Sequence, residues 1–438
     1  MSKNNYPHII YTYKGLQRIV LCLILICFLA KNINAQQFNN WYFQFYNGIT
    51  FNTSPPSFLP GSQLWAWNSC ATISDKQGIL LFSSEGRNIY DKQNNIMPNG
   101  TGILGDKCQI NGIVIIPFIN DTSKYYVFTA QGLSNFIANS QSTLQYSYSI
   151  VDMKANGGLG DVISKNNFIR FFSTEKMTAI PHANGTDIWW ICRDWTNNFY
   201  SYKITCNGFQ NINPVISTIG DNINSNLQLL NSGDIKASSD GKYIAVCYRT
   251  YFEIYQFNNL TGILSNPIKI PTESCYGVEF SPNSKILYIT QAISSLTFSG
   301  ITQYNLDNYD SSSIVNNRVL IASVLQVGLQ LGPENKIYAP VSLTNNNGVL
   351  INGLDVINNP NVLGAACNYQ SQVVSLPNPT YRRLPYSYVN LITAQNVQIP
   401  SYTVAPDCRT VTLTGKTYIK GNNLTFKWKF GDGDSTVQ

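Results

Sequence analysis

The chain has 438 residues, of which 44% are hydrophobic and 13% aromatic, so it can build a large core and intrinsic disorder is disfavoured. Charged residues make up only 12%, about half the usual share of roughly 25%, which disfavours a bundle of amphipathic helices rich in Glu, Lys and Arg. The formal net charge of +6 falls to +2 (25 basic minus 23 acidic residues) without residues 1–35, so no basic surface for nucleic acid or anionic lipid is expected.

Residues 1–35 have the features of a secretory signal peptide. Lys3, Lys14 and Arg18 precede an unbroken apolar run over 19–30, and the small residue Ala35 ends the segment. The run is shorter than the roughly 20 residues of a membrane span, although an N-terminal anchor helix is the alternative. No later segment approaches that length. We therefore expect a chain that is secreted or held at the cell surface, with no membrane span after signal removal.

The rest of the chain repeats one pattern, in which an apolar strand, a polar turn and a second apolar strand follow one another. The turns contain Asp, Asn, Gly, Ser or Pro, which suit a tight hairpin. Successive turns are about 43 to 62 residues apart, the length of a four-stranded propeller blade with variable outer loops. The six copies are Ala71–Phe82, Ile113–Phe128, Met177–Ile191, Ile235–Val246, Val278–Ile289 and Leu329–Ala339.

These repeats predict an all-β fold with a β-propeller of seven blades, within a range of six to eight. A seventh blade can be assembled from Ser375–Ile392 together with Trp41–Phe51, so that both ends of the domain close the ring. An irregular pair of β-sandwiches is the alternative. A third strand follows several hairpins, as at Gln145–Val151, Phe252–Phe257 and Thr302–Leu306.

The composition changes near Pro400, where shorter alternating segments such as Leu424–Phe430 are typical of sandwich strands. Roughly 40 residues remain, whereas an Ig-like sandwich needs roughly 100. The predicted organisation is a signal peptide at 1–35, a propeller at 36–399 and an incomplete Ig-like domain at 400–438.

Two parts of the sequence resemble known families. Trp428–Gly433 (WKFGDG) resembles the W-x-F-G-D-G motif of PKD domains, which are Ig-like. Residues 38–395 resemble the N-terminal propeller of exported surface proteins of gliding bacteria, the cargo of type IX secretion. That resemblance implies PKD repeats as spacers and a C-terminal sorting domain, which this sequence does not contain. The matching stretches include Asn40–Phe43, Met97–Leu104, Val151–Asp161, Tyr276–Pro282 and Ile357–Tyr369.

The sequence offers little for catalysis or metal binding. His182 is the one histidine after residue 35, and it is expected to bond backbone in a hairpin turn, so Ser-His-Asp chemistry lacks its parts. Gly157–Gly160 lacks a following Lys or helix and is expected to connect strands. No cofactor is expected, although Asp432 and Asp434 could hold Ca²⁺ as an alternative to a tight turn. The eight cysteines after residue 35 leave disulfides and buried thiols equally open.

Five charged residues are the candidate ligand-binding site. They lie on or beside the first strands of three successive repeats, which line the channel of a propeller, and their mixed signs suit a sugar or peptide better than a bare metal ion. The alternative is that they satisfy strand ends and each other. The residues are Glu175, Lys176, Asp234, Lys236 and Glu279.

Tryptophans near the turns could stack on sugar rings, although blade packing is expected to use at least half of them. The sequence thus predicts a non-catalytic binding or adhesion module for polysaccharide or a surface protein. A structural stalk without a ligand and a hydrolase of the lactonase-like propeller class are the alternatives. The tryptophans are Trp65, Trp67, Trp189, Trp190 and Trp195.

Overall fold

The computed structural model describes most of the chain between residues 36 and 386, and the predicted signal peptide lies outside the described residues. Within the described part, no helix combines the length and apolar character that crossing a membrane would require. The described ranges are 36–132, 144–223, 233–292, 299–324, 327–340, 352–380, 383–386, 398–404, 411–416, 427–429 and 435–437.

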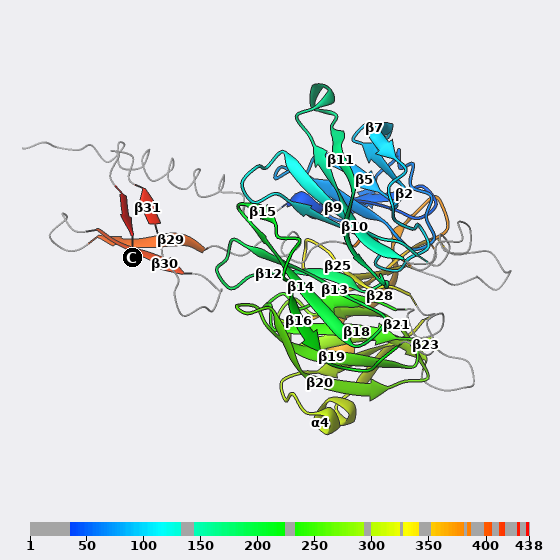
Figure 1. Cartoon of the computed structure of the whole chain (residues 1–438). Helices are drawn as coiled ribbons and strands as arrows, with labels where there is room; N and C mark the ends of the chain where they lie inside the picture. The colour runs from blue at the N-terminus through cyan, green and yellow to red at the C-terminus, as the bar shows by residue number, and fades with distance from the viewer. Residues whose placement is uncertain are drawn as a thin grey trace, which may run out of the picture. The chain divides into compact units, whose positions relative to one another are not determined.

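The chain folds into seven antiparallel sheets that follow one another around a ring, which is a seven-bladed β-propeller (Figure 1). Blade 1 contains β4 (Ala71–Ser74), β5 (Leu80–Ser84), β6 (Asn88–Asp91) and β7 (Ile96–Thr101). Blade 2 contains β8 (Ile113–Pro117), β9 (Lys124–Ala130), β10 (Gln145–Asp152) and β11 (Asp161–Phe171). Blade 3 contains β12 (Met177–Pro181), β13 (Ile188–Arg193), β14 (Asn198–Thr205), β15 (Gly208–Phe209) and β16 (Val215–Thr218). Blade 4 contains β17 (Ile235–Ala237), β18 (Tyr243–Tyr248), β19 (Tyr251–Asn258) and β20 (Ile263–Pro271). Blade 5 contains β21 (Ser274–Phe280), β22 (Ile286–Ala292), β23 (Ser299–Asn305) and β24 (Val319–Ser323). Blade 6 contains β25 (Gln330–Leu331), β26 (Ile337–Pro340), β27 (Gly353–Ile357) and β28 (Tyr369–Ser375). Blade 7 contains β1 (Asn40–Phe43), β2 (Asn47–Thr50) and β3 (Ser57–Phe58).

The six predicted hairpins are confirmed, because each forms the first and second strands of blades 1 to 6. The predicted third strands are confirmed as β10, β19 and β23. Short helices lie only in connections within the described part. They are η1 (Gln36–Phe38), η2 (Asn156–Gly158), α4 (Ser311–Asn316) and η3 (Gly364–Cys367).

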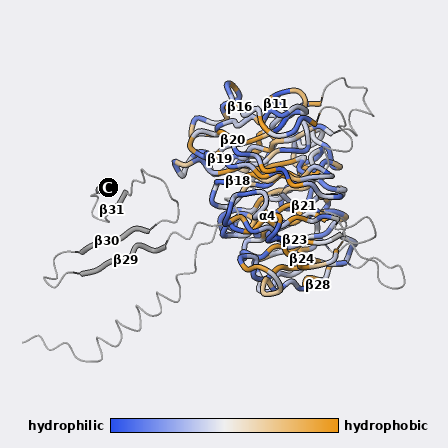
Figure 2. Tube along the Cα trace, turned by 90° about the horizontal axis from the view of Figure 1, so that it is seen from below, coloured by the Kyte–Doolittle hydropathy of each residue, from blue (hydrophilic) through white to orange (hydrophobic). Residues whose placement is uncertain are grey.

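Hydrophobic strands pack between neighbouring blades and form the core. Every residue of β13, including its two tryptophans, is buried, because a strand inside a propeller is covered on both faces. The first strands of blades 1 to 6 contact one another in chain order around the channel. Figure 2 shows hydrophobic stretches running through the interior of the ring and hydrophilic ones in the connections.

The predicted contribution of Trp41–Phe51 to the seventh blade is confirmed as β1 and β2, whereas the described residues after Ser375 lie beside blade 7 without forming a strand of its sheet. Trp41 of β1 is fully buried and packs edge-on against Tyr338 of blade 6, with ring centroids 5.6 Å apart. From the other end of the domain, Tyr386 N donates to Cys70 O at 3.0 Å, beside the first strand of blade 1. Leu384 and Tyr386 belong to the same core cluster as Trp41. Residues 381–382 and 387–392 of the predicted seventh blade lie outside the described residues.

The Ig-like domain stays a prediction. Within 400–438 the described residues form two strand pairs, β29 (Gln398–Val404) with β30 (Val411–Lys416) and β31 (Lys427–Lys429) with β32 (Ser435–Val437). The rest of the segment, including Asp432 and Asp434, lies outside the described residues.

Candidate ligand-binding face and channel

Three loops form one continuous surface at the channel mouth where the first strands begin. The loop over 59–70 joins the loop over 102–112, since Trp67 N donates to Lys107 O at 3.2 Å. The second loop reaches the connection over 172–176, because the backbone of Ile110 hydrogen-bonds to the Glu175 carboxylate. We call this surface, with the turns at 44–46 and 194–197, the loop face.

The five predicted charged residues come together in the channel, but at different depths rather than as one ring at the mouth. Lys236 and Glu279 lie deepest, each one residue before the last paired residue of its first strand. Glu175 and Lys176 precede β12 altogether. The difference arises because the number of residues between the charge and the hairpin turn varies from blade to blade.

Lys236 and Glu279 form a buried ion pair, with Nζ and Oε2 3.2 Å apart and both side chains 6% exposed. Lys236 Nζ also donates to Gln330 Oε1 at 2.6 Å, and Glu279 accepts from the backbone N of Leu331 at 2.9 Å. Burial raises the pKa of Glu279, and the Lys236 ammonium opposes that rise. The two side chains satisfy each other, which favours the structural alternative for this pair.

Asp234 pairs across the channel with Arg383, a residue that the sequence analysis does not identify. Nη1 of Arg383 lies 2.5 Å from Oδ2 of Asp234, and both side chains are almost completely buried. Three residues later, Tyr386 shares a 2.5 Å hydrogen bond with Thr178 of blade 3. The C-terminal segment that contains Arg383 and Tyr386 is therefore bonded to blades 3 and 4 across the channel.

Glu175 and Lys176 lie nearest the loop face. Lys176 is fully buried and donates from Nζ to the carbonyl of Gly233. Glu175 is half-buried, and its Oε2 atom is enclosed without a hydrogen-bond partner. Burial raises the pKa of Glu175 to about 7, although the charges of Lys176 and Arg383 oppose the shift. Of the five charged candidates, Glu175 is the one with an oxygen left to accept a bond.

An exposed aromatic cluster lies on the same face. Trp65 and Trp67 are 40% and 41% exposed, and their rings lie 6.0 Å apart. Phe45 packs edge-on against both tryptophans, at 6.4 Å and 5.5 Å. The Lys107 ammonium lies 3.9 Å from the centre of the Trp65 ring. The cluster thus offers ring faces and edges beside a cation. By contrast, Trp189 and Trp190 are buried between blades, as the packing alternative predicts for part of the set.

The turn that presents this cluster has an unfavourable backbone. Asn47 N donates to Gln44 O at 3.0 Å and closes a β-turn whose central residues, Phe45 and Tyr46, have φ of 44° and 65°. Such turns favour Asn and Gly, because bulky side chains are strained at positive φ. Other hairpin turns of the propeller have small residues at these positions, mostly Asn or Gly. Their left-handed residues include Gly78, Asn94, Gly185, Gly241, Ser284 and Asn335.

A second aromatic pair lies on the loop face at blade 3. Phe172 is 48% exposed with φ of 65°, and its ring lies 5.7 Å from that of Trp195. Trp195 Nε1 donates to Ser173 O at 2.7 Å. Within the described residues, aromatic side chains occupy positive φ at Phe45, Tyr46 and Phe172, all on this face.

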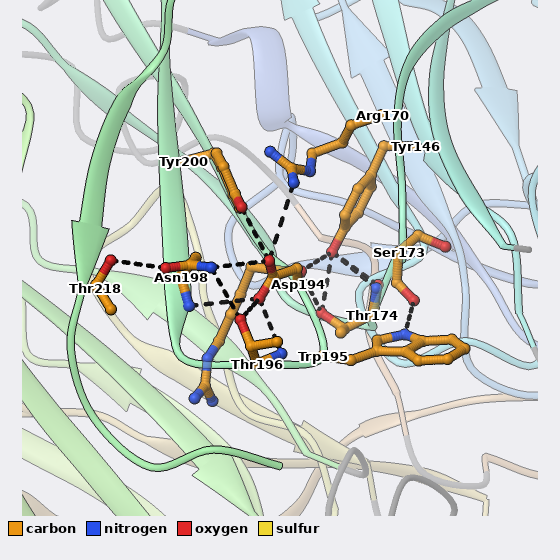
Figure 3. Close-up of polar contacts among 11 residues, drawn as sticks. Tyr146, Arg170, Ser173, Thr174, Asp194, Trp195, Thr196, Asn198, Tyr200 and Thr218 are labelled. Atoms are coloured by element: carbon orange, nitrogen blue, oxygen red, sulfur yellow. Dashed lines mark hydrogen bonds and ion pairs between the residues drawn. The ribbon is translucent and has the colours of Figure 1, made fainter. Parts of the chain in front are cut away.

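A polar network holds the turn that carries Trp195 (Figure 3). Asp194 accepts from Thr196 N at 2.9 Å and from Tyr200 OH at 2.9 Å, and Arg170 lies 3.9 Å away. Burial opposes ionisation of Asp194, but hydrogen bonds from Thr196, Tyr200 and Asn198 outweigh it and hold the pKa below its usual value. The Asp194 carboxylate finds its partners within this network, so its bonds position the turn.

His182 lies in the hairpin turn between β12 and β13, as predicted, and its Nδ1 accepts from Asn184 N at 3.0 Å. Gly157–Gly160 connects β10 to β11, also as predicted. Arg383, Tyr386 and Gln330 were not predicted from the sequence, and neither was the strained turn. The pair Phe45-Tyr46 between two short apolar strands was the one available signal, since a tight turn there would normally contain Asn or Gly.

Comparisons with known proteins identify similar folds at low sequence identity. No protein-family model matches the chain, and no curated protein matches it. A protein from Lactobacillus plantarum is 10% identical at a TM-score of 0.45, over 79% of this chain and 98% of that one. A putative 6-phosphogluconolactonase from Bacteroides fragilis is 11% identical at a TM-score of 0.43, over 73% and 89%. Likenesses at this level assign no activity to this chain.

The buried pair gives a stability prediction. Lys236→Met should lower the free energy of unfolding by about 3–5 kcal/mol, because it leaves the Glu279 carboxylate buried without its counter-charge. Lys285→Met is the matched control, since its ion pair with Asp307 has side chains 62% and 53% exposed and should change stability by less than about 1 kcal/mol. Urea unfolding at pH 7 measures both, and equal effects would contradict the assignment.

Glu175 should make stability depend on pH. Its pKa is about 7 in the folded chain against 4.5 for an unperturbed carboxyl, so between these values the folded state holds a proton that the unfolded state has released. The free energy of unfolding should therefore fall as pH rises through that window, by up to ~1.4 kcal/mol per pH unit from this group, and level off above it. Glu175→Gln should remove the decline, whereas Glu273→Gln, a change at an exposed glutamate, is the matched control and should keep it. Parallel curves for wild type and Glu175→Gln would contradict the expectation.

Proposed function

We propose that the chain is an exported, non-catalytic binding module that contacts polysaccharide through its loop face. The strained aromatic residues of this face carry the proposal. Strain of about 1–3 kcal/mol per residue persists only where the surrounding structure enforces it, and such residues cluster at ligand sites. Phe45, Tyr46 and Phe172 are strained in this sense, and all three are on one face.

The chemistry of the face supports a sugar as the ligand. Tryptophan rings offer flat apolar surfaces to the C–H faces of a sugar, and Trp65 and Trp67 are both partly exposed. The low charge content of the chain, 12%, also suits a neutral, hydroxyl-rich ligand better than a charged one.

The rigidity of the ring supports a binding role over a catalytic one. Lys236, Glu279 and Asp234 are paired within the channel, so they hold the inner strands in place. A surface fixed before binding loses less conformational entropy when a ligand arrives. His182 lies at the far end of its strand from Glu175, in a turn that uses its imidazole. Export and PKD-type spacing, which the resemblance implies, would place such a module outside the cell.

Removing the two tryptophans tests the proposal. Trp65→Ala combined with Trp67→Ala should weaken binding about 10- to 100-fold, because each lost stacking contact contributes on the order of 1 kcal/mol. Titration calorimetry against a panel of neutral glucans, xylans and mannans measures the change. The matched control is Phe168→Ala with Phe171→Ala, an exposed aromatic pair 4.6 Å apart on β11, which should leave binding unchanged.

Other results would favour the alternatives. If no polysaccharide binds the wild type but whole cells do, the partner is a surface protein. If neither binds, the structural stalk gains support. Hydrolysis of a lactone that is lost in Glu175→Gln would establish an enzyme instead.

Replacing the turn residues gives a second test, in which stability should rise while ligand binding weakens. Phe45→Asn with Tyr46→Gly supplies the residues that a turn with two positive φ values prefers, so the free energy of unfolding should rise by about 1 kcal/mol. Binding should weaken in the same variant, because the Phe45 ring no longer supports Trp65 and Trp67. Thermal unfolding and calorimetry measure the two effects, and a variant that is less stable than wild type would contradict the strain argument.

A further inference from the structure

The aromatic rings of the loop face stand at steep angles to one another. The planes of the Trp65 and Trp67 rings cross at 70°. The Phe45 ring meets these two planes at 65° and 89°. In the second aromatic pair, the Phe172 and Trp195 rings cross at 64°. None of these four ring pairs is coplanar, so the loop face does not offer one flat aromatic platform.

Neighbouring groups hold two of the indole rings in place. The Lys107 ammonium lies over the Trp65 ring, 3.9 Å from its centre, and covers one of its two faces. Trp195 Nε1 donates to Ser173 O at 2.7 Å, which fixes the second indole (Figure 3). Turning either ring toward the plane of its aromatic neighbour would break the contact that holds it. The steep angles are therefore a fixed property of the surface.

Direct contacts join the aromatic cluster to the second aromatic pair. The loop over 102–112 accepts a 3.2 Å hydrogen bond from the backbone N of Trp67. The same loop packs against Gly132 so closely that a β carbon there would lie 2.2 Å from the nearest of its side-chain atoms. Gln131 O in turn accepts from Ser173 Oγ at 2.9 Å. A continuous protein surface thus runs from one group of rings to the other.

The crossed rings discriminate between the physical forms of a polysaccharide. The surface of a solid polysaccharide is flat, so it can stack on several rings at once only if their faces share a plane. A dissolved chain can rotate about its glycosidic bonds and turn successive sugar faces in different directions. Rings that are fixed before binding select the chain conformation that meets them, at a low cost in protein entropy. Ring angles of 64° to 89° suit such a chain.

We propose that the loop face binds one dissolved polysaccharide chain, which crosses from the aromatic cluster to the second aromatic pair, and not the flat surface of a solid polysaccharide. The inference rests on the proposed function and narrows its ligand class. Because Lys107 covers one face of Trp65, a sugar can stack only on the other face, so the chain lies over the surface. At the far end, Phe172 is 48% exposed and is the more accessible ring of its pair.

Comparing two physical forms of the same polysaccharide tests the ligand class. The full chain should bind a glucan, xylan or mannan hexasaccharide in titration calorimetry, and it should stay in solution when mixed with the insoluble polymer of the same linkage. Adsorption to the solid at least as tight as binding to the dissolved chain would overturn the inference and leave the proposed function standing. Binding to none of these probes in either form would remove the proposed function, and this inference with it.

A substitution in the second aromatic pair tests the path of the chain. Phe172→Ala should weaken binding of the soluble polymer about 5-fold, the effect of one lost stacking contact. Phe172→Tyr retains the ring and should keep the wild-type affinity. Phe168→Ala is the matched control, since Phe168 is 44% exposed on the same blade and should leave binding unchanged. All three positions are at the surface, so the thermal midpoint should stay near that of the wild type. Equal affinity of Phe172→Ala and wild type for the polymer would overturn the proposed path.

Discussion

Hydrogen bonds across the channel are the constraint on which the ring depends. Arg383, in the segment after blade 6, pairs with Asp234 beside the first strand of blade 4, and Tyr386 bonds to Thr178 of blade 3. Asn111 Nδ2 adds a 3.1 Å bond to the carbonyl of Ile235. Burying such groups is costly unless each finds its partner, so the bonds are satisfied together only when opposite blades are in register. They define one ring arrangement, which in turn fixes the loops at the channel mouth.

The sequence predicted the blades well because their signals are local. Turn residues and apolar alternation identify hairpins such as Ile235–Val246 without knowledge of the rest of the chain. Arg383 was not predictable in that way, since its partner lies 149 residues away and its own segment contains no hairpin pattern. The depth of each charge in the channel also escaped prediction, because it depends on how far each strand extends before its turn.

The exposure of aromatic residues was the least predictable feature. Trp67 and Trp190 both lie beside turns in the sequence, yet one is 41% exposed and the other fully buried. The difference is decided by the neighbouring blade, which covers β13 on both faces and leaves the loop over 59–70 open. The φ values of Phe45 and Tyr46 show that the protein holds aromatic residues where a smaller residue would be easier to accommodate.

The contact between the two ends of the domain also governs the order of events during synthesis. Asn47 Nδ2 of blade 7 donates to the carbonyl of Asn378, 331 residues later, so this contact can form only after most of the propeller has been synthesised. Contacts this distant in sequence form slowly, because a long loop must close first. The ring therefore cannot close until the segment around Asn378 has been made.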